Sequence, residues 1–273
     1  MKNLIYQYWD GNVKESVRAG SEAMREYSVR IGADYVFEDN PRYIKDRRFG
    51  NYSPHYGAFK PVFEKPFRDY DNVLFADTDV FPKKSLVENI FEVPDPGYHI
   101  AIAQEPDEPA RREITLGRIT SASDNKWATM VKDRYGASVP RDEKGRVKVY
   151  NTGVVLYSNK GMENVRGFFD SFDYYVNDVK AHGLDSFYTC DQPYLHCQMF
   201  AFELKIHELS PDWNSIITGA RLKGIKGGNR HIIDGRTDNS KFVHCQFPGA
   251  DDMDNRQLEK IVNLPREEWG YDI

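Results

Sequence analysis

The first 38 residues of the sequence limit the possible folds most strongly, because they predict a strand, an amphipathic helix and a second strand in that order. Residues 4–8 are largely apolar and indicate the first strand. Between Val13 and Ile31, apolar residues recur in steps of three and four, which is typical of a helix that packs on a sheet. Gly32 ends this helix, and residues 34–38 indicate another strand. Such a unit joins two parallel strands, so we expect an α/β fold with a central sheet flanked by helices.

A later apolar run, residues 73–76, carries two carboxylates at its end, Asp77 and Asp79. Side chains two positions apart in a strand share a face, so these carboxylates start about 6.5 Å apart and can converge. Two carboxylates about 4 Å apart repel each other by about 4 kcal/mol at an effective dielectric constant of roughly 20. Hard cations such as Mg²⁺ and Mn²⁺ prefer carboxylate oxygens and are often shared with substrate phosphates. We therefore predict a metal–diphosphate site here, with a solvated turn rich in Asp as the alternative.

The rest of the chain continues the alternation of helices and strands. We predict helices at about 56–67, 162–179 and 191–200, and further strands at about 98–103, 149–157 and 241–245. One domain is expected over residues 1–273. It would include a polar insert at about 104–148 that faces the substrate, and a flexible basic loop at about 217–240.

The composition narrows the partners and the compartment. The chain of 273 residues has a formal net charge of −5 and no basic cluster, which disfavours a nucleic-acid partner. Its three cysteines are not spaced as metal ligands, and without a secretory leader they indicate reduced thiols and a cytoplasmic location. No apolar segment approaches the roughly 20 residues that span a bilayer, so we expect no transmembrane segment.

Several polar residues lie at the ends of predicted elements. His244 follows the apolar Phe242–Val243, and neutral imidazole is a good ligand for manganese-like ions, although a lone His here is more often structural. Gly153, two residues after Asn151, permits a ligand to approach the backbone of a strand closely, and a bulge explains it equally well. Asp191, followed by Gln192, starts a helix either as its N-cap or as a carboxylate that faces a sugar hydroxyl or a developing cationic carbon.

Two other groups of residues are candidates for contacts with a nucleotide. Tyr8, Trp9 and Asp10 end the first strand, where a base could stack and its ring nitrogen could find an acceptor; packing explains Trp9 about as well. Lys223 and Lys226, on a Gly-rich segment, could clamp a diphosphate when the loop closes. An ordinary solvated basic loop is the alternative for these lysines.

Taken in this order, the motifs resemble those of GT-A glycosyltransferases, most closely the glycogenin and bacterial galactosyltransferase family (family 8). The shared pattern is a helix and an apolar strand that ends in Asp-x-Asp (59–79), an Asn-x-Gly strand (151–156), an Asp-Gln pair (191–192) and a final His244. The resemblance spans about residues 3–250. After His244 the family has a Gly three residues on and then a Lys, whereas this chain has Gly249 followed by acidic residues, so Lys223 or Lys226 would replace that Lys.

The resemblance implies a single GT-A, Rossmann-like domain that acts as a metal-dependent hexosyltransferase. It would move a sugar from a nucleotide-diphosphate sugar, usually a UDP-sugar, to a saccharide or another hydroxyl acceptor, with retention of configuration. Asp77, Asp79 and His244 would hold Mn²⁺ or Mg²⁺, while Asp191 and Gln192 would lie beside the reacting anomeric carbon as catalytic residues. The implied donor-binding residues are Tyr8, Trp9, Asp10, Lys60, Asp77, Thr78, Asn151, Gly153, Lys223, Lys226 and Gly249.

Two other functions are compatible with parts of this pattern. An apolar strand followed by Asp-x-Asp also resembles haloacid-dehalogenase-type phosphatases, with Asp77 as the nucleophile and Asp79 as the acid/base. That nucleophile normally lies on the first strand of the chain, whereas here a complete strand–helix–strand unit precedes it. The second alternative is a non-catalytic, metal-dependent sugar-binding module, which would leave Asp191 and Gln192 without a chemical purpose.

Overall fold

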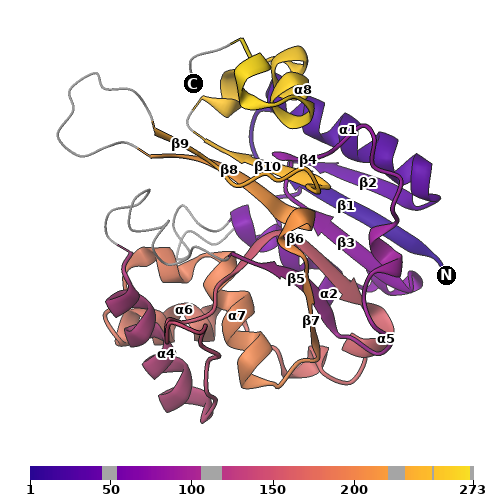
Figure 1. The fold of residues 1–273 in the computed structure, drawn as a ribbon. Helices are drawn as coiled ribbons and strands as arrows, with labels where there is room; N and C mark the ends of the chain where they lie inside the picture. The colour runs from indigo at the N-terminus through magenta and orange to yellow at the C-terminus, as the bar shows by residue number, and fades with distance from the viewer. Residues whose placement is uncertain (45–53, 106–118, 221–230, 248, 271–273) are drawn as a thin grey trace.

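The computed structural model describes residues 1–44, 54–105, 119–220, 231–247 and 249–270, which form two sheets with helices on both sides (Figure 1). No helix within these ranges is long and apolar enough to cross a membrane.

The main sheet has six strands in the order β2-β1-β3-β6-β5-β7. β1 pairs in parallel with β2 and β3, β6 is antiparallel to both β3 and β5, and β5 is parallel to β7. This mixed sheet confirms the fold class and the initial strand–helix–strand unit. The strands are β1 Asn3–Trp9, β2 Asp34–Asp39, β3 Asn72–Ala76, β5 Ile100–Gln104, β6 Tyr150–Ser158 and β7 Ile206–Leu209.

A second sheet has four strands in the order β4-β10-β8-β9. β10 is antiparallel to β4 and parallel to β8, and β8 is antiparallel to β9. Its strands are β4 Val80–Pro82, β8 Ser215–Ala220, β9 His231–Asp234 and β10 Phe242–Gln246. β4 follows β3 after only three residues, so the chain passes from the main sheet to the second sheet through Asp77, Thr78 and Asp79.

Helices cover both faces of the main sheet (Figure 1). α1 (Glu15–Ile31) lies on the face near the second sheet, together with α8 (Asn255–Asn263). α4 (Ser121–Tyr135), α6 (Phe172–Ala181) and α7 (Asp191–Ala201) lie on the other face. Short helical segments complete the described chain: α2 (Lys60–Phe63), α5 (Asn159–Met162), η2 (Lys65–Asp69), η3 (Ile90–Glu92), η4 (Arg166–Phe168), η5 (Ser186–Thr189), η6 (Pro211–Asn214), η7 (Ala250–Asp252) and η8 (Arg266–Glu268).

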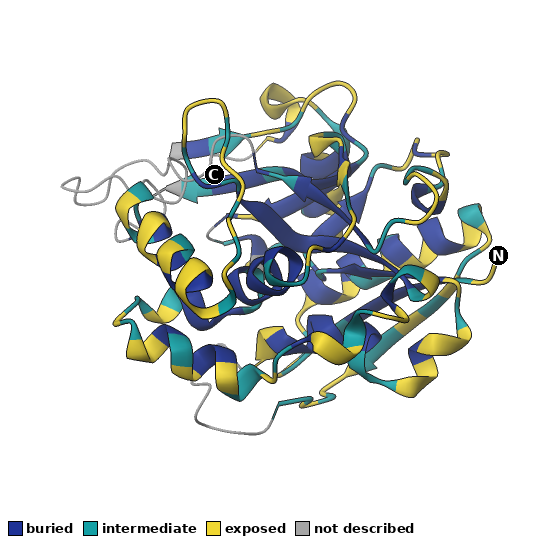
Figure 2. Ribbon diagram, turned by 90° about the horizontal axis from the view of Figure 1, so that it is seen from below, coloured by how far each residue is buried: buried dark blue, intermediate teal, exposed yellow. Residues whose placement is uncertain are grey.

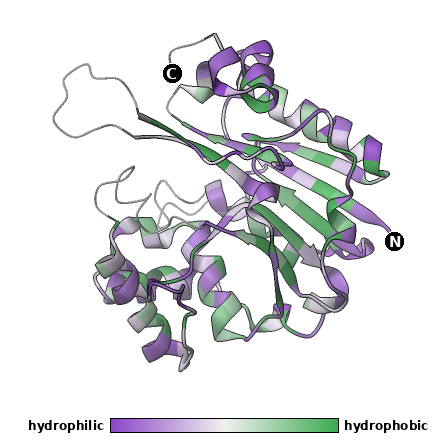
Figure 3. Ribbon diagram, viewed as in Figure 1, coloured by the Kyte–Doolittle hydropathy of each residue, from purple (hydrophilic) through white to green (hydrophobic). Residues whose placement is uncertain are grey.

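Successive side chains of the central strands point to opposite faces of the main sheet, and both faces are covered. Every residue of β3 and β6 is buried. Figure 2 shows buried strands at the centre of the molecule, with partly exposed helices around them. Val73 and Phe75 pack into the core shared with α4, α6 and α7, whereas Leu74 and Ala76 pack into the core shared with α1. The middle of each of these two strands is accordingly apolar on both faces, Val73–Ala76 in β3 and Val154–Tyr157 in β6. Figure 3 shows the hydrophobic residues gathered in the sheets and on the parts of the helices that pack against them.

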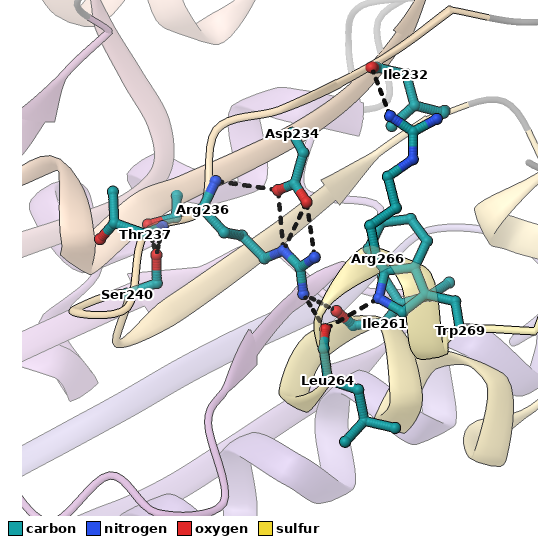
Figure 4. A network of polar contacts seen from close by, with 10 residues as sticks. Ile232, Asp234, Arg236, Thr237, Ser240, Ile261, Leu264, Arg266 and Trp269 are labelled. Atoms are coloured by element: carbon teal, nitrogen blue, oxygen red, sulfur yellow. Dashed lines mark hydrogen bonds and ion pairs between the residues drawn. The ribbon is translucent and has the colours of Figure 1, made fainter.

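The C-terminal helix α8 is attached to the second sheet through Arg236 (Figure 4). The Arg236 guanidinium donates to Asp234 Oδ2 from Nη2 at 2.6 Å and to the Leu264 carbonyl from Nη1 at 2.9 Å, and it also donates to the Ile261 carbonyl. It lies 4.7 Å from the ring of Trp269. Arg236 therefore satisfies carbonyl groups at the end of α8 that the helix cannot satisfy itself.

Two predicted helices are wrong in their extent. The helix expected at 56–67 is a series of short turns, α2 and η2 among them, because Pro61 and Pro66 cannot donate a backbone hydrogen bond. The helix expected at 162–179 is divided into α5, η4 and α6. Ser171 starts α6 afresh, since its side chain accepts a hydrogen bond from the backbone N–H of Tyr174.

The predicted polar insert at 104–148 includes a part of the core. Its helix α4 contributes Trp127, Met130 and Val131 to the apolar cluster beneath the main sheet. Residues 106–118 of the insert and residues 221–230 of the predicted basic loop lie outside the described residues. The assignment of the whole chain to one catalytic domain stays a prediction.

Candidate metal and donor site

The backbone of the turn between β3 and β4 is fixed by three hydrogen bonds, two to other backbone groups and one from a side chain. The N–H of Asp77 donates to the Gly153 carbonyl at 2.8 Å, and the N–H of Cys245 donates to the Asp79 carbonyl at 2.9 Å. The buried side chain of Gln7 donates to the Asp77 carbonyl at 2.9 Å. The backbone that carries the two carboxylates is thus bound to β1, β6 and β10.

Helix α1 packs closely against this same turn. A Cβ atom at Gly20 would lie 1.8 Å from the carbonyl oxygen of Thr78, so only glycine allows the helix to approach so near. Gly20 lies within the helix predicted between Val13 and Ile31, but the sequence pattern alone did not connect it with the site. The feature that could have indicated this contact is a glycine on the face of the helix that packs against the sheet.

Asp77, Asp79 and His244 come together at the junction of the two sheets. His244 lies on β10 directly opposite Val80 of β4, which follows Asp79. Its Nε2 is 3.1 Å from Asp79 Oδ1 and 3.8 Å from Asp77 Oδ2. One ligand atom from each residue lies within 4.8 Å of the others, so the three could hold a metal ion.

Electrostatics at this cluster favour a bound cation. Burial, followed by the negative charge of Asp79, raises the pKa of Asp77 well above its ordinary value. Burial lowers the pKa of His244, but the carboxylates of Asp79 and Asp77 outweigh this effect and leave the pKa raised. Although it is buried and close to both carboxylates, Nε2 of His244 makes no hydrogen bond of acceptable geometry. A metal ion would satisfy this nitrogen and relieve the repulsion between the acids.

A pocket of about 240 Å³ opens beside Asp77 and Asp79. It brings together six of the predicted residues, Tyr8, Trp9, Asp10, Asp77, Thr78 and Asp79, and is also lined by Ser16, Val17, Pro54, His55, Phe81, Cys245, Ala250 and Leu258. Within it, Trp9 Nε1 donates to the Asn12 carbonyl at 3.0 Å, and Asp10 Oδ1 accepts from the backbone N–H of Arg42 at 2.8 Å. The ends of β1 and β3 therefore form one wall of a single pocket.

Asn151 and Gly153 lie behind His244 and do not line this pocket. Asn151 is buried, and its amide is bonded to Glu105 and Asn214. A Cβ atom at Gly153 would lie 2.3 Å from Cε1 of His244. In this structure the glycine therefore makes room for the imidazole ring.

The side chains of Asp191 and Gln192 lie in different parts of the structure. The N-cap of α7 is Cys190 and Asp191 is the first helical residue, so the interpretation of Asp191 as the cap is wrong. Asp191 Oδ2 accepts a hydrogen bond from Thr152 Oγ1 at 2.5 Å. The negative charge of Asp191 also contributes to the raised pKa of Asp77, so Asp191 lies near Asp77, Asp79 and His244. Gln192 instead lines a separate small cavity of about 10 Å³ with Trp127 and neighbouring residues.

The remaining predicted donor contacts are less direct. Lys60 is buried, and its Nζ lies 2.6 Å from Glu38 Oε2, away from the pocket lining. Gly249 adopts φ 98° at the start of η7, next to Ala250, which does line the pocket. Lys223 and Lys226 lie outside the described residues.

Comparison with known proteins supports the fold. No protein-family model matches the sequence, and no curated protein matches it. An active-site mutant of LgtC has a similar structure, with a TM-score of 0.52 and 12% identity over 99% of this chain and 100% of that chain. Mouse xyloside xylosyltransferase 1 covers 89% of this chain and 96% of its own, with a TM-score of 0.49 and 12% identity.

A glycosyltransferase involved in the glycosylation of the major capsid of PBCV-1 covers 96% of this chain and 98% of its own, with a TM-score of 0.46 and 11% identity. The similarity to LgtC, which extends over both chains, confirms the GT-A-type fold predicted from the sequence.

Proposed function

We propose that the protein is a metal-dependent glycosyltransferase that transfers a sugar from a nucleotide-diphosphate sugar to a hydroxyl acceptor. The observation that carries this proposal is the cluster of Asp77, Asp79 and His244 at the edge of the 240 Å³ pocket, on a GT-A-type fold. The sequence motifs give independent support, because they resemble those of family 8 in the same order.

The three residues suit a divalent cation. Two carboxylates and one imidazole provide hard oxygen ligands and one nitrogen ligand, a set that favours Mn²⁺, with Mg²⁺ as the alternative. Nε2 of His244 makes no hydrogen bond of acceptable geometry and lies next to the carboxylates of Asp79 and Asp77, as a metal ligand would. When bound, the metal would act as a Lewis acid for the negative charge that develops on the departing nucleotide diphosphate.

The chain's own residues would then position the substrate. Tyr8, Trp9 and Asp10 would bind the nucleoside, with uridine as the proposed base. Asp191, oriented by its hydrogen bond from Thr152, would face the donor sugar and stabilise positive charge at the anomeric carbon. We propose retention of configuration on the family resemblance alone.

The first test is a panel of nucleotide sugars assayed for slow Mn²⁺-dependent hydrolysis and for transfer to simple saccharides. Asp77→Asn and Asp79→Asn should each lower the rate by on the order of 100-fold or more, since losing several kcal/mol of charge stabilisation has that effect. Asp238→Asn, which neutralises an exposed carboxylate before β10, is the matched control and should keep full activity.

Circular dichroism would verify that the variants remain folded. Full activity in either site variant, or in excess chelator, would contradict the proposal. Release of phosphate from sugar phosphates without any nucleotide sugar would indicate the phosphatase alternative instead.

A further inference from the structure

Four buried polar side chains form a continuous row behind the metal cluster. They are His244, Asn214, Asn151 and Glu105, and none is more than 5% exposed. His244 Nδ1 lies 3.0 Å from Asn214 Oδ1, Asn214 Nδ2 donates to Asn151 Oδ1 at 2.8 Å, and Asn151 Nδ2 donates to Glu105 Oε1 at 2.6 Å. The row joins both sheets, because Asn151 is the second residue of β6 and His244 lies on β10.

A backbone group determines the direction of every hydrogen bond in this row. The N–H of Gly153 donates to Asn151 Oδ1 at 2.9 Å, and a backbone N–H can only donate. The atom of Asn151 that it meets is therefore the oxygen, and the Asn151 amide nitrogen must face Glu105. Asn214 must then donate to the same oxygen through its own nitrogen, which turns Asn214 Oδ1 toward His244.

This direction decides which imidazole nitrogen carries the proton. Asn214 Oδ1 can only accept, so Nδ1 of a neutral His244 must be the protonated nitrogen. Nε2 then presents its lone pair toward Asp79 and Asp77. With Nε2–H, the proton would instead point at the carboxylates and exclude a cation.

We propose that Asn214 and Asn151, with Glu105 at the far end, are positioning residues that hold His244 in the Nδ1–H form needed for metal binding. The inference rests on the proposed function, because it assigns the metal ligands as above. The Glu105 carboxylate accepts a hydrogen bond from Asn151 Nδ2 and so helps to fix the orientation of the Asn151 amide. Outer hydrogen-bond partners of metal-ligating histidines typically change metal affinity by about 10- to 100-fold.

The first experiment measures Mn²⁺ binding by titration calorimetry for the wild type, Asn214→Leu and Glu105→Gln. Asn214→Leu should weaken binding by about 10- to 100-fold. Glu105→Gln keeps an acceptor for Asn151 and should weaken binding less. Asn72→Leu is the matched control, since Asn72 is also a buried, hydrogen-bonded asparagine but lies at the opposite end of β3. It should bind Mn²⁺ as the wild type does.

The second experiment needs neither metal nor activity. Nitrogen-15 NMR of the imidazole at alkaline pH, where its shifts no longer change with pH, should show a proton on Nδ1 of His244 in the wild type. In Asn214→Leu the proton should move to Nε2, toward Asp79. The His244→Gln variant assigns the signal. Because the wild-type spectrum alone tests the tautomer, a variant that fails to fold does not remove the test.

The outcomes separate this inference from the proposed function. A wild-type imidazole protonated on Nε2, or Asn214→Leu that binds Mn²⁺ as tightly as the wild type, would overturn the positioning role. A wild type that binds Mn²⁺ but transfers no sugar would overturn the proposed function and leave the positioning role intact.

Discussion

The main sheet and the second sheet are related to the sequence in different ways. β1, β2 and β3 of the main sheet follow one another along the first third of the chain and pair in parallel around α1. In the second sheet, the three-residue β4 pairs with β10, which comes from near the other end of the chain. Local pattern therefore accounts for this half of the main sheet, whereas the second sheet depends on contacts between distant segments. The candidate site lies where the two meet.

Because the second sheet joins distant segments, we expect its stability to depend strongly on a few polar contacts. Arg236→Met should lower the free energy of unfolding by about 3 kcal/mol, because it leaves the mostly buried Asp234 carboxylate and the end of α8 without their partner. Denaturant unfolding measures the change. Lys84→Met removes a more exposed ion pair with Glu259 and should cost less than about 1 kcal/mol. Equal losses in the two variants would show that Arg236 has no special role.

A second prediction concerns the link between the sheets. Mn²⁺ at about 100 times its dissociation constant should stabilise the protein by about 2.7 kcal/mol and raise Tm by roughly 5–10 °C. Amide hydrogen exchange should slow more in β10 than in β2, because β10 carries the proposed metal ligand His244 and β2 carries none. His244→Gln should reduce both effects. A uniform gain in protection across both sheets would argue against a bridging metal.

The third prediction, with a smaller effect on stability than Arg236→Met or bound Mn²⁺, concerns Gly153, where the two sheets are in contact. Gly153→Ala should destabilise the fold by about 2 kcal/mol and also weaken Mn²⁺ binding, since the new methyl group displaces the His244 ring. Thermal unfolding and metal titration measure the two effects. Gly167→Ala places the same methyl group in open space and should change neither. Metal binding that is unaffected in Gly153→Ala would mean that the imidazole tolerates the displacement.

Much of the proposed metal site could be predicted, because each proposed ligand follows an apolar run. Asp77 and Asp79 follow the buried β3, and His244 follows Phe242 and Val243 in β10. Strand pattern and ligand chemistry indicated the two aspartates, whereas His244 was added through the family resemblance. The structure brings the three residues together.

The residues that support this cluster could not be predicted in the same way. Gln7, Glu105 and Asn214 have no local feature that distinguishes them from other polar residues. Their roles arise from hydrogen bonds between segments far apart in the sequence. The helix expected at 162–179 was wrong for a related reason, since apolar spacing alone did not reveal the new helix start at Ser171.

The third proposed ligand lies far from the other two in the sequence, and this separation has a consequence during translation. Asp77 and Asp79 leave the ribosome well before His244 and the rest of β10 do. Until β10 emerges, the two carboxylates have no imidazole beside them, and any part of the main sheet that forms in this interval does so without the third proposed ligand. Manganese captured by all three residues would thus mark chains whose C-terminal segment has already docked.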